Sequence, residues 1–119
     1  MRGLGQLEAA VMEVLWAARS PLPVRGVMDA MTGRPLAYTT IMTVLDNLHR
    51  KDFVARDKHG RAYHYRPTLT RGEAWAGAMQ DLLREAGDAQ AVLLHFARTV
   101  SDGESEVLWS ALNRRKRKG

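Results

Sequence analysis

The chain has 119 residues, of which 45% are hydrophobic, and it contains no cysteine. This length suits one compact domain or a small domain with an appendage. The lack of cysteine excludes disulfides, thiolate metal sites and thiol nucleophiles. No apolar run approaches the roughly 18 residues that a membrane span needs, and no signal-peptide pattern is present, so we expect a cytoplasmic protein. The net charge of +5 favours a polyanionic partner.

The first half of the chain predicts three helices. Residues 4–18 place apolar side chains on one face of an amphipathic helix, and two prolines directly after it end the helix. A shorter helix is expected over residues 24–31, before the breaker cluster at residues 32–35. The third helix lies within residues 36–51, where apolar side chains recur at i, i+3, i+4 and i+7 as Ile41, Val44, Leu45 and Leu48.

The opposite face of the third helix carries short hydrogen-bonding side chains near its start and a basic one near its end. This face comprises Thr39, Thr43, Asp46 and Arg50, with Thr40 and Asn47 beside them. Small hydroxyl side chains let a helix backbone approach base edges in a DNA groove. We therefore predict that DNA bases are read by Thr39, Thr40 and Thr43. An ordinary amphipathic surface helix remains the alternative from this pattern alone.

A basic hairpin follows the third helix. Residues 53–57 and 61–66 predict two strands around a turn at residues 58–60, and Pro67 ends the second strand. Residues 50–66 hold six basic and two acidic side chains, a net charge of +4. Three helices followed by such a hairpin are the pattern of a winged helix-turn-helix, in which the third helix enters the major groove. The predicted contacts to DNA phosphates, from the helix and the wing, are Tyr38, Arg50, Lys51, Lys58, His59 and Arg61. Tyr38 is either such a contact or simply a residue at the helix start.

Residues 69–119 predict a helical dimerisation domain after a DNA-binding domain at residues 1–68. Thr70 and Glu73 form a capping-box pattern, and Asp88 is suited to cap a further helix. The three short helices are too apolar for about 45 isolated residues to conceal, so we expect them to pack on a second copy. Their predicted contacts are Trp75, Met79, Leu82, Leu83, Val92, Leu93, Phe96, Leu108 and Leu112. Five basic residues at 114–118 are expected to form a solvated, disordered tail.

The sequence offers no catalytic or cofactor-binding pattern. It lacks the GxSxG, HExxH and glycine-rich phosphate-loop motifs, so we predict neither an enzyme nor a cofactor. His59 and His64 lie across the hairpin from each other, but no acidic or sulfur ligand accompanies them, and no metal site is predicted. Two functions stay open: a sequence-specific DNA-binding repressor, or a winged-helix module for protein–protein interaction. The uncompensated charge of the hairpin favours the repressor.

Several segments resemble one protein family: residues 7–16 (LEAAVMEVLW), 36–54 (LAYTTIMTVLDNLHRKDFV), 60–67 (GRAYHYRP) and 91–99 (AVLLHFART). They are similar to the penicillinase-repressor (BlaI/MecI/CopY) family of bacterial transcriptional regulators, in its actinobacterial form. The resemblance implies a homodimeric winged-helix repressor with a dyad-symmetric operator, controlling β-lactam-resistance or related genes. It also implies inactivation by cleavage, which a membrane-bound sensor protease triggers.

The chain departs from this family pattern in two places. Copper-responsive members carry paired cysteines near the C-terminus, and this chain has none, so copper or zinc sensing through thiolates is excluded. Staphylococcal-type members are cut at an Asn-Phe bond, and the matching bond here joins His95 and Phe96. Cleavage at this bond is therefore an expectation from the resemblance, and the inducing signal stays open.

Overall fold

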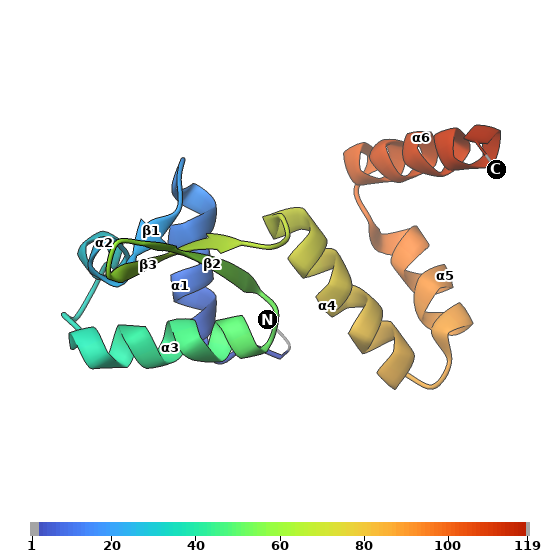
Figure 1. Ribbon diagram of the computed structural model, residues 1–119. Coiled ribbons are helices and arrows are strands. Elements are labelled where there is room, and N and C mark those ends of the chain that lie inside the picture. Colours follow the sequence, from blue (N-terminus) through green and yellow to red (C-terminus); the bar gives the residue numbers. More distant parts are fainter. Residues whose placement is uncertain (1–2, 119) are drawn as a thin grey trace. The chain divides into compact units, whose positions relative to one another are not determined.

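The computed structural model describes residues 3–118, with side chains as far as residue 116. The end residues of the two predicted domains, Met1, Arg2 and Gly119, lie outside the described residues. The elements in chain order are α1 (Gln6–Ala17), β1 (Leu22–Pro23), α2 (Val24–Ala30), α3 (Tyr38–Arg50), β2 (Val54–His59), β3 (Ala62–Pro67), α4 (Arg71–Glu85), α5 (Ala89–Thr99) and α6 (Asp102–Lys118) (Figure 1). Within residues 3–118, none of these helices is long and apolar enough to cross a membrane.

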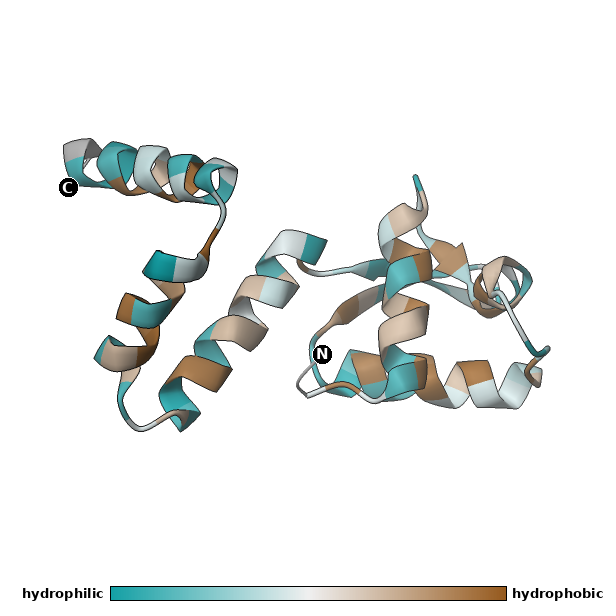
Figure 2. Ribbon diagram, turned by 180° about the vertical axis from the view of Figure 1, so that it is seen from behind, coloured by the Kyte–Doolittle hydropathy of each residue, from teal (hydrophilic) through white to brown (hydrophobic). Residues whose placement is uncertain are grey.

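The chain divides into two compact units, one as far as Met79 and one from Gln80 onward. The first unit therefore includes the start of α4, beyond the boundary predicted after residue 68. In this unit α1 contacts both α3 and β3, and α2 contacts α3 and β1 (Figures 1 and 2). One hydrophobic core lies between these elements, formed by Val11, Met12, Leu15, Val24, Val27, Ile41, Val44, Leu45, Leu48, Val54 and Tyr65.

Helix α3 carries the threonines that are predicted to read DNA bases, which we call the reading face. The buried apolar side chains on its opposite side fix the orientation of the helix. The four apolar side chains expected at i, i+3, i+4 and i+7 are all buried. The helix ends where Asp52 adopts a left-handed backbone conformation with φ 64°. There the Asp52 N–H donates to the His49 carbonyl at 3.1 Å, and the Phe53 N–H donates to the Leu48 carbonyl at 3.0 Å. These bonds satisfy two of the last carbonyls of α3, at the point where the chain turns into β2.

The three strands form an antiparallel sheet in the order β1-β3-β2. The hairpin pairs residues from Val54↔Pro67 to His59↔Ala62, so its turn contains only Gly60 and Arg61. The predicted turn at residues 58–60 is thus wrong, because Lys58 and His59 belong to β2. Gly60 has φ 65°, which lets so short a turn reverse the chain.

Strand β1 was not predicted from the sequence. Its two residues were interpreted only as part of a proline-rich helix breaker, yet Leu22 pairs with Tyr65 and Pro23 pairs with His64. Proline is tolerated in a strand at the edge of a sheet, because its missing N–H need not serve a second neighbour there. The strand links the start of α2 to the hairpin and so fixes the hairpin on the helices.

The helix caps predicted for the second half of the chain are confirmed. The Thr70 N–H donates to the Glu73 carboxylate at 2.8 Å and the Glu73 N–H donates to the Thr70 hydroxyl at 3.0 Å, while Asp88 accepts from the Ala91 N–H at 3.0 Å. The expectation of a disordered basic tail is wrong, because α6 continues to Lys118. Arginine and lysine are good helix formers, and positive charge at a helix C-terminus is favoured by the helix dipole.

The second unit leaves its apolar side chains exposed. Between residues 80 and 116 no side chain is buried, and hydrophobic segments follow one another along α4 and α5 (Figure 2). The predicted dimerisation residues, of which Trp75 and Met79 belong to the first unit, are 41–57% exposed, apart from the half-buried Leu83. Three further large apolar side chains are exposed in the same way, namely Leu94, Val107 and Trp109. An apolar surface of this kind is typical of an interface with another protein chain.

Candidate nucleic-acid interface

The outer face of α3 presents the predicted threonines. Thr39 and Thr43 are exposed, and Thr40 is half-buried at the edge of the face. The Thr43 hydroxyl donates to the Thr39 carbonyl at 2.9 Å, a bond within the helix. The hydrogen of this hydroxyl is therefore satisfied, while its oxygen lone pairs and its methyl group are free for a partner. At the end of the same face, Arg50 donates to the Asn47 side-chain oxygen.

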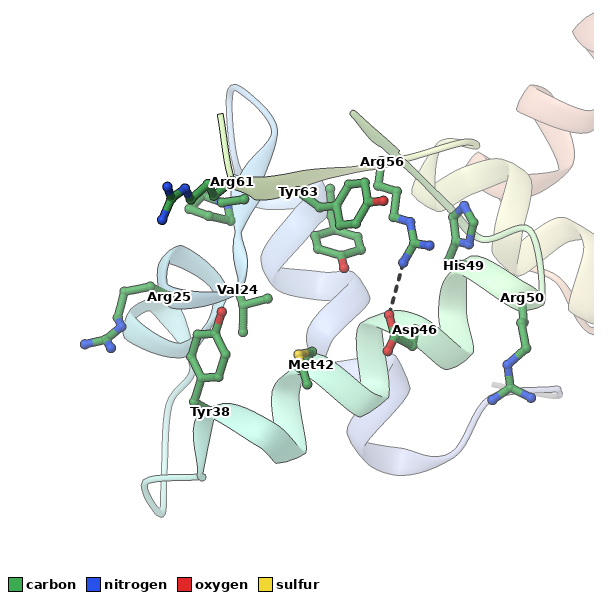
Figure 3. Close-up of a pocket in the computed structure, with 13 residues that line it drawn as sticks. Val24, Arg25, Tyr38, Met42, Asp46, His49, Arg50, Arg56, Arg61 and Tyr63 are labelled. Atoms are coloured by element: carbon green, nitrogen blue, oxygen red, sulfur yellow. Dashed lines mark hydrogen bonds and ion pairs between the residues drawn. The ribbon is translucent and has the colours of Figure 1, made fainter. Parts of the chain in front are cut away.

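An open groove of about 640 Å³ separates α3 from the β2–β3 hairpin, which we call the wing (Figure 3). Its lining, the α3–wing groove, comprises Pro23, Val24, Arg25, Tyr38, Met42, Asp46, His49, Arg50, Arg56, Arg61, Ala62, Tyr63 and Tyr65. This set contains four arginines and a histidine against one carboxylate. The excess of positive charge in such a lining attracts anionic partners.

Asp46 and Arg56 connect the two walls of the groove. The Arg56 guanidinium donates to the Asp46 carboxylate at 3.1 Å and lies 4.3 Å from the centre of the Tyr63 ring (Figure 3). The pKa of Arg56 is raised, first by a side-chain hydrogen bond with Tyr65 and also by the charge of Asp46. Asp46 was expected on the outer face of α3 among the threonines. Its carboxylate instead pairs with the wing.

The wing has two faces with different surroundings. Residues of one strand alternate between faces, so Arg56 and Lys58 share the face of Tyr63, whose ring lies 5.8 Å from the Lys58 ammonium. His59 and His64 share the other face, with their ring centres 4.5 Å apart. The predicted contact His59 therefore lies on the face away from the groove. Among residues 3–118, no group of three histidine or acidic side chains could hold a metal ion.

Lys51 is engaged elsewhere than at the groove. Its ammonium donates to the Glu8 carboxylate at 2.8 and 3.0 Å and to the Gly3 carbonyl at 3.1 Å. Partial burial raises the pKa of Glu8, but the hydrogen bond from Gly5 and the charge of Lys51 outweigh it, so the pKa is lowered. Lys51 thus holds the end of α3 to the start of α1, which the prediction of a phosphate contact did not anticipate.

Most of the groove lining was absent from the predicted site, including the charged and aromatic residues Arg25, Asp46, Arg56 and Tyr63. Arg25 lies in the first turn of α2, and its guanidinium lies 6.0 Å from the centre of the Tyr38 ring. Arg56 and Tyr63 belong to the hairpin, where the alternation of side chains along each strand was the available signal. That signal separates the two faces of the hairpin but does not say which of them turns toward α3.

Comparisons with known proteins agree on a regulator. A sequence model described as penicillinase repressor matches residues 4–114. The transcriptional regulator BlaI of Mycobacterium tuberculosis is 44% identical over 113 residues, which cover 92% of this chain and 82% of the relative.

Solved structures of other regulators share the fold. MepR, a transcription regulator of the Staphylococcus aureus multidrug efflux pump MepA, is 16% identical with a TM-score of 0.52, covering 98% of this chain and 80% of its own. A MarR/EmrR family transcriptional regulator from Acinetobacter is 18% identical with a TM-score of 0.50, covering 98% and 77%. At these identities the likeness shows the fold alone. It confirms the predicted class, a mainly α winged-helix fold with a small hairpin.

Proposed function

The chain belongs to the penicillinase repressor family of transcriptional regulators, and from this premise we propose that it is a sequence-specific DNA-binding repressor that binds a dyad-symmetric operator as a homodimer. The observation that carries the proposal is the juxtaposition of the polar outer face of α3 with the cationic α3–wing groove. In a winged helix-turn-helix the third helix enters the major groove, and one DNA backbone then runs between that helix and the wing. The α3–wing groove has the charge that such a backbone requires.

We assign base readout to the first two turns of α3. Thr39 and Thr43 are one turn apart, and their short side chains let the helix backbone come close to the base edges. Thr40 stands at the edge of this face, nearer to a DNA backbone. The free oxygen lone pairs of Thr43 can accept from a base amino group, and its methyl group can contact a thymine methyl.

Replacing Thr43 tests base readout. We expect Thr43→Ala to weaken binding to the cognate operator by about 1–3 kcal/mol and to leave binding to random duplex nearly unchanged. The matched control is Thr99→Ala in α5. Thr99 is also exposed, and its hydroxyl also donates to a carbonyl of its own helix, that of Phe96, at 3.1 Å. Fluorescence anisotropy with both duplexes measures the effect. Equal losses on the two duplexes would show that Thr43 does not read sequence.

Phosphate contacts are assigned to the groove and the wing tip. Arg25, Arg50 and Arg61 line the groove, and Tyr38 contributes an aromatic wall beside Arg25. Lys58 is exposed next to the tip, on the face that Tyr63 shares. His59 and Lys51 are weaker contributors to this proposal, because one lies on the far face and the other is paired with Glu8.

Removing Arg61 tests the wing. Each neutralised phosphate contributes about 0.9 to the slope of log K against log salt, so Arg61→Ala should flatten this slope by about 0.9 on operator and random duplex alike. Arg98→Ala in α5 is the control, because it removes the same charge from an exposed position outside the groove. An unchanged slope and affinity for Arg61→Ala would exclude the hairpin as a DNA-contacting wing. It would then favour the alternative function, a module for protein–protein interaction.

The exposed apolar side chains of α4, α5 and α6 support the homodimer in this proposal. Among them, Phe96 and Leu108 are 41% and 45% exposed in the single chain. A second copy would remove this apolar surface from water and hold two copies of α3 at a fixed spacing along the DNA. Cleavage between His95 and Phe96 by a sensor-triggered protease would remove the end of α5, all of α6 and a large part of this surface. The regulated genes, by the same family reasoning, are those of β-lactam resistance or a related response.

A further inference from the structure

Asp46 is the one carboxylate in the lining of the α3–wing groove as far as the structure describes the chain. It lies on the groove side of α3, one turn after Met42, and its carboxylate is directed at Arg56 on the opposite wall (Figure 3). A negative charge among the four arginines of this groove opposes the entry of any phosphate. Its presence there requires an explanation in terms of DNA binding or of stability.

Stability is a poor explanation for this pair. The Asp46 side chain is 50% exposed and the Arg56 side chain is 27% exposed. An ion pair open to water to this degree gains little free energy, because water screens the attraction and the two side chains lose rotamer freedom. The core beneath α3 is already fixed by its four buried apolar side chains.

The contacts of Arg56 show what the pair does to the guanidinium. Asp46 occupies one of its donors at 3.1 Å, and the Tyr63 ring lies 4.3 Å from its central carbon. An arginine held in this way is not free to bind a phosphate unless it first leaves the carboxylate. Asp46 is the one carboxylate of the lining and it pairs with Arg56. The lining therefore offers no second carboxylate to the other groove arginines, Arg25, Arg50 and Arg61.

We propose that Asp46 is an internal competitor of DNA phosphate for Arg56, and that it sets the strength of DNA binding by withholding one groove cation. This inference rests on the proposed function and deepens it. In the wild-type protein Arg56 stays with Asp46 and contributes no phosphate contact. When the carboxylate is removed, Arg56 is released toward the groove and binds the backbone of any duplex.

The test is the salt dependence of binding to a random duplex. Asp46→Asn keeps the size of the side chain and removes its charge, so Arg56 should add one phosphate contact. The slope of log K against log salt should steepen by about 0.9. Over the tenfold fall from 1 M to 0.1 M salt, this steeper slope should strengthen the binding of the variant by about eightfold relative to the wild type. Asp46→Glu retains the carboxylate and should keep the wild-type slope.

Two further variants separate this mechanism from a general effect of charge. Asp57→Asn removes the same charge from the wing, but Asp57 pairs with Arg66 at 3.7 Å on the face away from the groove, so the slope should not steepen. In an Arg56→Gln background, Asp46→Asn should no longer change the slope. Thermal melting of each variant checks that the fold is retained.

Each alternative outcome identifies what fails. If Asp46→Asn weakens binding, or leaves the slope unchanged, the pair is a structural brace and the inference is overturned. The same holds if Asp57→Asn steepens the slope as much, or if the gain persists without Arg56. If the wild-type protein binds neither operator nor random duplex at low salt, the proposed function fails and takes this inference with it.

Discussion

A fragment ending at His95 is expected to be mostly monomeric and to bind a full operator about 10²–10⁴-fold more weakly than the whole chain. In a dimer the second half-site contact is intramolecular, and this advantage is lost when the subunits separate. The fragment lacks five of the exposed apolar side chains of the second unit, namely Phe96, Val107, Leu108, Trp109 and Leu112. It keeps the complete core of the first unit, whose members lie between Val11 and Tyr65. The reading face should therefore stay folded while operator affinity falls.

Sedimentation equilibrium and operator titration measure these two effects. The matched control is a fragment ending at Asn113, which removes the basic end of α6 and leaves every exposed apolar residue in place. This longer fragment should still dimerise. A fragment ending at His95 that dimerises and binds as tightly as the whole chain would contradict both the dimer interface and the proposed consequence of cleavage.

Leu45→Ala is expected to lower the free energy of unfolding by about 2–5 kcal/mol, because it leaves a cavity in a packed core. Leu45 is 0% exposed and lies in the middle of the α3 stripe. Loss of this anchor should also weaken DNA binding, since the position of the outer face depends on the buried one. Urea denaturation at a fixed protein concentration measures the change, because dimer stability depends on concentration.

Met42→Ala is the control for Leu45→Ala on the same helix. Met42 is 38% exposed and lines the α3–wing groove, so its truncation should change the free energy of unfolding by less than about 1 kcal/mol. Losses of similar size at the two positions would mean that the core does not hold α3 through its apolar stripe.

Local patterns in the sequence were sufficient for the helices and their caps. The stripe of Ile41, Val44, Leu45 and Leu48 predicted both α3 and its buried face, because the helical period alone decides which side chains share a face. The capping box of Thr70 and Glu73 predicted the start of α4 in the same way. Such features depend on residues within one turn of each other, so the sequence contains all the information they require.

The sheet and the helical structure of the basic tail were harder to predict from the sequence. Strand β1 exists because Leu22 and Pro23 meet β3 more than 40 residues later in the chain, a pairing that no local pattern signals. The length of the hairpin turn depended on the strand register, which tertiary packing selects. For residues 114–118 the charge run indicated disorder, although the same residues are good helix formers and continue α6.

The sequence by itself determined the class of this protein: its three helices and basic hairpin, its polar α3 face, its apolar C-terminal helices and its family. Only the tertiary structure decided which charged side chains meet. It directed Asp46 to Arg56 across the groove, brought Arg25 beside Tyr38 and turned Lys51 away to Glu8. Burial follows from hydrophobic periodicity within one element, but a pair of partly exposed charges forms only where the packing of several elements brings them within a few ångströms.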